Sequence, residues 1–177
     1  MINPLPKSVE GKSPFVHLFE FVATADNTPF LCIEAALTFR EIVCGGEAAI
    51  QQYCRKLARQ AAERSMEVWG TEIMETEGLD RDGESAMIQV RLPISVADSG
   101  GDGDGDVSAE EAMDVPNHIH EMLVKEYDTF AVTFLHAGKL WVRWSGQIYL
   151  ELADFEKGIQ AMADLCKRVR EGRWKCG

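Results

Sequence analysis

The stretch from Phe130 to Tyr149, FAVTFLHAGKLWVRWSGQIY, is the sequence feature that most constrains the fold. On both sides of a short turn, apolar, aromatic and β-branched residues alternate with a period of two, which is typical of half-buried strands. Gly138 supplies the positive φ that a tight connection between strands often needs. The sequence therefore predicts a β-hairpin, with Arg143 on the strand face that also carries Trp141 and Ser145.

Helical patterns and a second pair of short strands flank this hairpin. Thr28 is a good N-cap, Pro29 suits a first helical position, and Gly45-Gly46 ends the helix that they begin. The predicted order is helix, helix, strand, strand, helix, strand, strand, helix, with helices at 30–43, 47–69, 115–127 and from about 154, and strands at 71–75 and 86–94. This order predicts an α+β fold with a small antiparallel or mixed sheet and helices on one face.

Length and composition fit one globular domain preceded by an arm. The chain has 177 residues, of which 46% are hydrophobic, enough for a sizeable core. Three prolines near the N-terminus indicate an arm and connecting segment over 1–28, followed by a domain over 29–174. No apolar run reaches the length of a membrane span, no secretory signal core is present, and the five cysteines form no CxxC pair. We therefore expect a cytoplasmic protein with mostly buried, reduced thiols.

An acidic stretch dominates the net charge of −11. Val96–Asp114 holds seven acids and no base, and the rest of the chain carries only about −4. Phosphate contacts need a basic face, so this composition excludes a nucleic-acid binder. The Gly/Asp-rich residues 96–108 are predicted to form a disordered surface loop. They do not match a calcium-binding loop, because the sixth and twelfth positions counted from Asp102 hold Val107 and Met113 instead of glycine and glutamate.

The histidines and glycines form no recognisable metal or phosphate site. His118 and His120 are two residues apart on a predicted helix, so they point to different sides and cannot bind one ion together. We expect both at the surface, and His136 as a residue of the hairpin turn. Neither GxxxxGK[ST] nor GxGxxG occurs, and no Ser/His/Asp arrangement has recognisable local context.

Arg143 is the most informative single position. An arginine inside an otherwise apolar strand needs a charged or polar partner. Its planar guanidinium pairs bidentately with a carboxylate, and a strand holds it more rigidly than a loop would. One interpretation is a binding site for the carboxylate of a ligand. The other is an internal salt bridge to an acid on one of the helices, and the sequence alone does not decide between them.

Three segments together resemble a known family. ATADNTPFLCIEAALTFREIVCGGEAAIQQYCRKLA, WGTEIME and EYDTFAVTFLHAGKLWVRWSGQIYLELADFEKG resemble the C-terminal part of class V aminotransferase-like enzymes, above all the fungal isopenicillin N epimerase-like group that includes hercynylcysteine sulfoxide lyases. The resemblance runs from about Pro14 to Trp174. It implies the smaller C-terminal domain of a fold-type I enzyme that uses pyridoxal 5'-phosphate (PLP), and this domain closes over a large cofactor-binding domain.

The resemblance also implies roles for individual residues. The segment Ala23–Pro29 is similar to a family segment near the cofactor, which implies that Thr24 approaches the phosphate and that Thr28 belongs to the same cofactor-binding stretch. Arg143 matches the strand arginine that binds the α-carboxylate of the substrate. This chain departs from the family at Ala23, where glycine is usual, and around the predicted pocket, where Trp144 and Leu150 replace a small aliphatic residue and an asparagine.

Family chemistry needs a lysine that forms the internal aldimine, and no lysine here has the expected context. We therefore expect the large PLP-binding domain to be absent and this chain to supply the substrate-binding or lid portion of an amino-acid C–S lyase or epimerase, inactive alone. The alternative is a degenerate, non-enzymatic module that acts through contacts with itself or with an intact paralogue. In that case the loss of a partner domain leaves an apolar surface uncovered, expected at 14–22.

Overall fold

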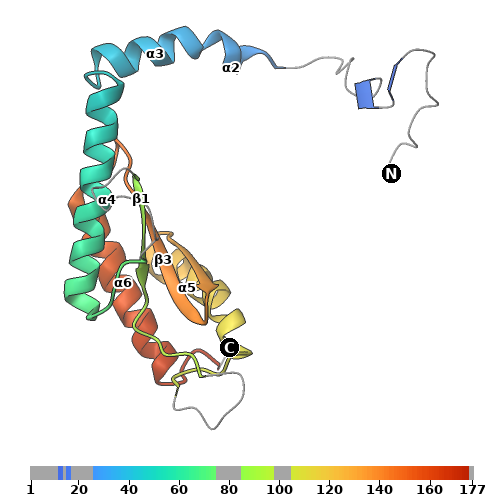
Figure 1. The fold of residues 1–177 in the computed structure, drawn as a ribbon, viewed down its shortest axis with the longest axis vertical. Coiled ribbons are helices and arrows are strands. Elements are labelled where there is room, and N and C mark those ends of the chain that lie inside the picture. Colours follow the sequence, from blue (N-terminus) through green and yellow to red (C-terminus); the bar gives the residue numbers. More distant parts are fainter. Residues whose placement is uncertain (1–11, 14, 17–25, 75–84, 98–104, 176–177) are drawn as a thin grey trace. The chain divides into compact units, whose positions relative to one another are not determined.

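The computed structural model describes residues 12–13, 15–16, 26–74, 85–97 and 105–175 (Figure 1). The chain divides into two units, residues 1–44 and 45–177. The first unit contains α2 (Thr28–Leu31) and α3 (Ile33–Ile42). The second contains α4 (Glu47–Trp69), β1 (Met87–Arg91), the 3-10 turn η1 (Glu111–Met113), α5 (Val115–Tyr127), β2 (Val132–His136), β3 (Lys139–Ser145) and α6 (Leu152–Arg170).

The second unit is built on a three-stranded antiparallel sheet with the order β1-β3-β2. Its hairpin is the one that the sequence predicts, and its two-residue turn places Ala137 and Gly138 at φ values of 49° and 71°. Arg143 of the central strand lies opposite Gln89 on one side and Val132 on the other. The register fixes which side chains share a face, and it confirms that Trp141, Arg143 and Ser145 point the same way.

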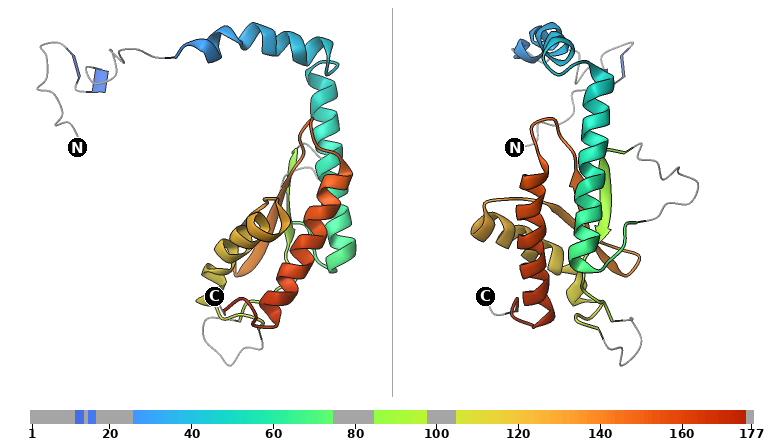
Figure 2. Two further views of the ribbon diagram at one scale, coloured as in Figure 1. Left: turned by 180° about the vertical axis from the view of Figure 1, so that it is seen from behind. Right: turned by 90° about the vertical axis from the view of Figure 1, so that its left-hand side faces the viewer.

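The helices cover one face of this sheet, as the predicted α+β architecture requires (Figure 2). Helix α4 lies against α6, β1 and β3, and α5 lies against α6 and β2. The side chains that β1 and β3 direct into this layer are buried together with the apolar stripes of the helices. These strand residues are Ile88, Val90, Leu140, Val142 and Trp144. The opposite face of the sheet, which carries Arg143, packs against none of these helices.

Helix α4 has the bounds that the sequence predicts. Ile50, Cys54, Leu57 and Ala61 are all buried against the rest of the unit. The helix ends at Gly70, which adopts the left-handed conformation with φ 65°. Glycine has no Cβ atom, so this conformation causes no steric clash. The apolar period of 3.6 residues was therefore sufficient to place this helix.

The first unit differs in detail from the prediction. Thr28 is the first helical residue of α2 and not its N-cap, and the backbone N–H of Thr28 is bound by the Asp26 carboxylate at 2.9 Å. The predicted single helix is interrupted at Cys32, so that α2 and α3 follow each other as separate segments.

Two loop predictions also change. The strand predicted at 71–75 is reduced to one bridge, from Ile73 to Val90, with residue 75 outside the described residues. The acidic loop predicted as disordered over 96–108 is ordered at both ends, because Val96 bridges to Val107, which is almost fully buried. Residues 98–104, and most of the segment 14–22, lie outside the described residues. Among the described residues, no helix is long and apolar enough to cross a membrane.

Candidate functional site

Arg143 projects from the central strand β3, on the sheet face opposite the helical layer. It is half-buried, and its Nε atom is buried without a hydrogen-bond partner. Within the described part of the chain, no acidic side chain forms an ion pair with its guanidinium. Other arginines of the same unit are paired: Arg168 Nη1 lies 2.6 Å from Glu126, and Arg64 Nε lies 2.7 Å from Glu156. The internal salt bridge that the sequence left open for Arg143 is therefore not formed with a described residue.

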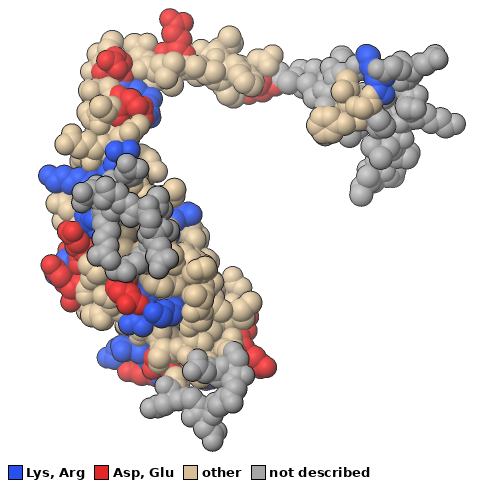
Figure 3. All heavy atoms as spheres, viewed as in Figure 1, with Lys and Arg blue, Asp and Glu red and all other residues tan. Residues whose placement is uncertain are grey.

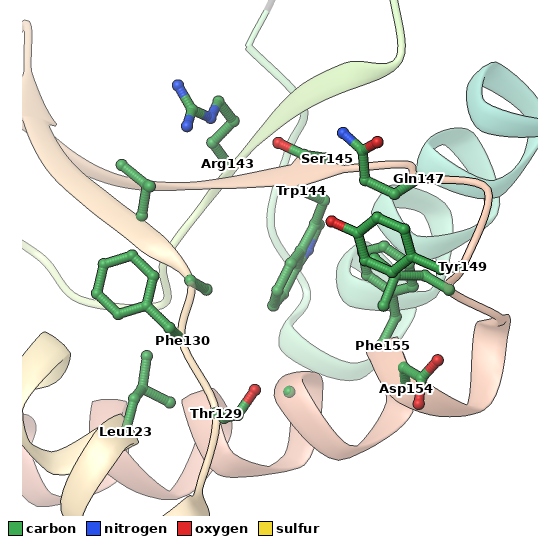
Figure 4. Close-up of a pocket in the computed structure, with 14 residues that line it drawn as sticks. Leu123, Thr129, Phe130, Arg143, Trp144, Ser145, Gln147, Tyr149, Asp154 and Phe155 are labelled. Carbon is green, nitrogen blue, oxygen red and sulfur yellow. The ribbon is translucent and has the colours of Figure 1, made fainter. Parts of the chain in front are cut away.

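A hollow of about 310 Å³ lies beside this arginine, where β3 runs past the start of β2 (Figure 4). Figure 4 shows Arg143 and Trp144 on opposite sides of the β3 ribbon, with Phe130 and Tyr149 on two sides of the hollow. The walls are mainly apolar and aromatic, and the polar groups of the lining are Thr129, Arg143, Ser145, Gln147, Tyr149 and Asp154. A mainly apolar wall with a few polar groups is the usual lining of a small-molecule site.

Trp144 fixes the direction in which Arg143 points. Its indole Nε1 donates a hydrogen bond to Oγ of Ser65 on α4 at 2.8 Å, and its ring meets Phe155 of α6 edge-on at 5.7 Å. A Cβ atom on Gly158 of α6 would lie 3.3 Å from the same ring, so the glycine leaves room for the indole. Because neighbouring strand residues point to opposite faces, locking Trp144 into the helical layer directs Arg143 to the other face of the sheet.

The chain that follows β3 is held closely against α4. Gly146 passes so near the backbone of Cys54 that a Cβ atom would lie 2.0 Å from the Cys54 carbonyl oxygen. The Tyr53 hydroxyl donates a hydrogen bond of 2.6 Å to the carbonyl of Leu150. Sequence reasoning missed these roles of Tyr53 and Gly146. A glycine directly after a predicted strand was the available signal, since glycine there often marks close approach of another backbone.

Asp154 is already used by the fold. Its carboxylate accepts a hydrogen bond from the Glu151 N–H at 2.9 Å, as part of a reciprocal capping box at the start of α6. Arg143 is then the one charged group of the lining whose hydrogen-bonding capacity is not taken up by another described residue. The arrangement favours an anionic group on the ligand.

The two histidines of α5 have structural partners, contrary to the surface positions expected. The ring Nε2 of His120 accepts a hydrogen bond of 2.8 Å from the backbone N–H of Thr133 on β2. The ring of His118 lies 5.8 Å from that of Trp174. Partial burial lowers the pKa of both histidines. Among the described residues, no group of three His, Cys, Asp or Glu side chains is arranged to bind a metal.

The cofactor-binding residues predicted from the resemblance, Thr24 and Thr28, stay predictions. Thr24 lies outside the described residues, and Thr28 belongs to the first unit, where its hydroxyl hydrogen bond lowers the pKa of Asp26. Among the described residues, no lysine lines the hollow. The Lys139 ammonium is paired with Glu72 at 2.9 Å, and Lys125 is paired with Glu121. The described residues therefore do not by themselves fit a covalently attached PLP.

Comparison with known proteins extends this description. The chain is 33% identical over 170 residues to an L-cysteine desulfhydrase-like protein, lolT1, of Epichloe uncinata, and 34% identical over 167 residues to lolT2 of the same organism. It is 27% identical over 142 residues to hercynylcysteine sulfoxide lyase of Schizosaccharomyces pombe (strain 972). The chain is similar to part of each of these proteins. This confirms the resemblance that the sequence indicates.

The matches cover most of this chain but only part of each relative. They take in 90%, 89% and 80% of this chain, and 37%, 36% and 30% of the three relatives. The chain thus spans about a third of the length of the curated relatives. Its fold is also distantly similar to a solved structure of Oryza sativa TDC with PLP and tryptamine, with a TM-score of 0.40 at 14% identity over 71% of this chain and 23% of that one. No family model matches the chain.

Proposed function

We propose that this chain supplies the carboxylate-binding wall of a PLP-dependent enzyme that cleaves or rearranges an amino acid, with C–S lyase chemistry as the leading reaction type. The observation that carries the proposal is Arg143, a strand arginine with a buried Nε and no described acidic partner beside a hollow. The names of the relatives, L-cysteine desulfhydrase-like protein and hercynylcysteine sulfoxide lyase, support a sulfur-containing amino acid as the substrate class.

In this proposal, the chain's own residues bind and orient the substrate. The guanidinium of Arg143 donates two parallel hydrogen bonds to the planar carboxylate, and the Trp144–Ser65 contact holds that strand in position. In the complete enzyme, PLP held by residues other than those described would supply the electron sink for breaking a bond next to the amino group.

We assign the cofactor lysine to a part of the enzyme outside the described residues, because no described lysine lines the hollow. On this basis we expect the chain alone to turn over no amino acid and to form no lysine-dependent absorption band with PLP. Thr24 and Thr28 remain the proposed phosphate-side residues, and Thr28 would have to exchange its contact with Asp26 for one with the phosphate. The proposed location is the cytoplasm.

The test uses a chimera of lolT1, one of the two Epichloe uncinata relatives. In the chimera, this chain replaces the aligned third of lolT1. Arg143→Ala is expected to raise KM for the amino acid at least about tenfold, because removal of one partner of a buried charged pair costs more than about 1.4 kcal/mol. Arg143→Lys should recover only part of the loss, since lysine cannot bind bidentately. Arg91→Ala is the matched control on the same sheet face, where Glu72 already pairs with the arginine. Unchanged kinetics in Arg143→Ala would remove this residue from the site.

A second candidate function is a non-enzymatic module that binds another protein, for which the exposed apolar residues of α2 and α3 are the favouring observation. Its partners would be a second copy of the chain or an intact paralogue. If the chimera has no activity but the chain still associates with a family polypeptide, this second function is favoured.

A further inference from the structure

One wall of the hollow is the short segment 129–132, which joins α5 to β2. Phe130 and Val132 line the hollow from this segment, called here the 129–132 wall. Figure 4 shows Phe130 and Tyr149 on opposite sides of Trp144. Phe130 is 60% exposed, so the core holds little of its ring. The position of this ring therefore depends on what fixes the two ends of the segment.

Both ends of the 129–132 wall are held by α5. At the first end, the backbone N–H of Thr129 donates a hydrogen bond of 3.2 Å to the carbonyl of Leu123. At the second end, the backbone N–H of Thr133 donates a hydrogen bond of 2.8 Å to Nε2 of His120. The first bond belongs to the end of a helix, where the backbone itself supplies the acceptor. The second end depends on the side chain of a single residue.

His120 covers the edge of the sheet at this point. The order β1-β3-β2 makes β2 an edge strand, and the N–H of Thr133 is directed to the His120 ring instead of β3. The same ring nitrogen lies 3.0 Å from Oγ1 of Thr133, and the His120 ring lies 5.1 Å from that of Phe130. One imidazole therefore contacts both the strand that continues the wall and the aromatic ring of the wall.

This hydrogen bond acts next to the strand position that faces Arg143. Val132 is the register partner of Arg143, and Thr133 is that of Val142. Thr133 is almost fully buried. Release of its N–H would therefore loosen the wall beside Arg143, although His120 does not line the hollow itself.

Protonation of His120 removes the lone pair that the hydrogen bond uses. Nε2 accepts the N–H of Thr133, so the proton of the neutral ring is on Nδ1. An imidazolium carries an N–H on both nitrogens, which places a donor against the Thr133 N–H. The charged ring and the hydrogen-bonded wall therefore exclude each other in this arrangement.

The charged groups around His120 do not control its protonation. The neighbouring titratable groups on the elements that it contacts are His118, Glu121 and Lys125 on α5 and His136 on β2. Glu121 and Lys125 pair with each other, and Arg168 of α6 acts on the pKa of His118. Within the described part of the chain, burial alone lowers the pKa of His120. In the view of Figure 3, uncharged residues form most of the surface over the β2–β3 hairpin.

We propose that His120 is a positioning residue of the candidate site: the neutral imidazole holds the 129–132 wall beside Arg143, and proton uptake releases this wall and weakens the binding of a carboxylate ligand. The ligand part of this proposal rests on the proposed function. The release of the wall does not, because it follows from the hydrogen bond between His120 and Thr133.

The first measurement is NMR of the full chain, titrated from about pH 7.5 to about pH 5, where a histidine of lowered pKa takes up its proton. The His120 ring signal reports protonation, and hydrogen exchange of the Thr133 amide reports the hydrogen bond. The Leu92 amide is the matched control, because it donates a bond of equal length, 2.8 Å, to the carbonyl of Leu140 in the same unit.

As His120 titrates, Thr133 is expected to lose about two- to tenfold more exchange protection than Leu92, the range that one net hydrogen bond gives. His120→Gln supplies an acceptor that does not titrate and should keep Thr133 protected, whereas His118→Gln should leave the response of Thr133 unchanged. Equal loss at Thr133 and Leu92 would mean that acid destabilises the whole unit without releasing the wall, and would overturn the proposal.

The second measurement compares KM with kcat for the lolT1 chimera over the same pH range, with L-cysteine as the probe. The ratio of the wild-type KM to the His120→Gln KM is expected to rise about two- to tenfold toward acid, with the ratio of kcat values unchanged. A constant KM ratio, in a chimera whose KM responds to Arg143→Ala, overturns the positioning role. If the chimera is inactive or ignores Arg143→Ala, the proposed function fails instead, and the Thr133 amide alone decides whether His120 holds the wall.

Discussion

The indole Nε1 of Trp144 donates a hydrogen bond 2.8 Å long to Oγ of Ser65, and this bond joins β3 to α4 inside the helical layer. The same hydroxyl donates to the carbonyl of Ala61 at 2.7 Å, so both the donor and the acceptor capacity of Ser65 are used. Ser65 itself is fully buried. The pair is therefore a polar contact inside a core that is otherwise apolar.

Ser65→Ala leaves the Trp144 N–H buried without its acceptor. We expect the free energy of unfolding to fall by about 1–3 kcal/mol, the cost of an unsatisfied buried donor. Urea denaturation followed by tryptophan fluorescence measures this change. Ser85→Ala is the control, because the Ser85 hydroxyl is exposed and binds only its near neighbour Met87. A Ser65→Ala protein as stable as the wild type would show that water or a shifted side chain replaces the hydroxyl.

Gly146→Ala should be among the most damaging single substitutions in the second unit. The added methyl group would lie 2.0 Å from a backbone oxygen of α4, so the helix and the chain after β3 must move apart. We expect a loss of about 3 kcal/mol or more in unfolding free energy, the upper range for overpacking. Thermal melting measures this loss of stability, which can then be compared with the loss caused by a substitution at a second glycine.

Gly70→Ala is the matched glycine control for Gly146→Ala. Gly70 has φ 65° and open space around the Cβ position, so its cost is conformational, about 1 kcal/mol. Asparagine tolerates that conformation and should recover stability at position 70, but it should not do so at position 146. Equal losses at both positions would contradict a steric role for Gly146.

Local pattern was enough to predict the elements whose signals are periodic. The period of 3.6 places α4 and α5, the period of two places the hairpin, and both lead to the α+β fold that the structure has. Prediction from local pattern failed for residues whose structure depends on partners distant in the sequence. Ile73 pairs through a single bridge, and Val107 is buried despite its Gly/Asp-rich surroundings, because Val96 lies beside it. Neither contact can be predicted from the residues next to it in the sequence.

The candidate site was predictable in part for the same reason. Alternation places Arg143 on the face shared with Trp141, but it cannot show whether an acid from another element reaches the guanidinium. The contacts of Tyr53 with Leu150 and of Gly146 with Cys54 join segments nearly a hundred residues apart. Spacing rules describe neighbours along the chain, so such contacts need the folded arrangement.

Acidification should destabilise the second unit through His120. Burial lowers the pKa of His120 below its ordinary value of 6.5, so the unfolded chain binds more protons than the folded one. Its contribution is fully present above pH 6.5 and is lost as the pH falls from 6.5 through the folded-state pKa. Protonation also removes the Nε2 lone pair that accepts the Thr133 N–H. His118 contributes with the same sign, because burial lowers its pKa as well.

Urea titrations between pH 7 and pH 5 measure this slope, which for each histidine cannot exceed about 1.4 kcal/mol per pH unit. His120→Gln offers an acceptor without a titratable ring and should flatten the slope, and adding His118→Gln should flatten it further. A wild-type stability that does not change over this range would contradict the coupling.

Tyr127 should titrate in strong alkali. Burial and the hydrogen bond from its hydroxyl to Asp164, 2.5 Å long, raise its pKa to about 12. Ultraviolet absorbance of the ionised phenol should therefore show one tyrosine ionising near that pH, and Tyr127→Phe should remove this step. The same substitution should lower the unfolding free energy by about 1 kcal/mol, since it also breaks the contact with Arg168. Retention of the step in Tyr127→Phe would assign it to another tyrosine.

Arg143→Leu should leave the second unit as stable as the wild type, or up to about 1 kcal/mol more stable. The substitution removes a buried Nε that no described residue satisfies and keeps an apolar side chain on the strand. Arg168→Leu is the contrasting control, because Arg168 is paired with both Glu126 and Asp164, and its loss should destabilise the protein. A residue that costs stability yet belongs to a binding site is the expected trade-off between stability and function. If Arg143→Leu instead lowers the unfolding free energy as much as Arg168→Leu does, Arg143 has a structural partner, and the salt-bridge interpretation of this residue is the correct one.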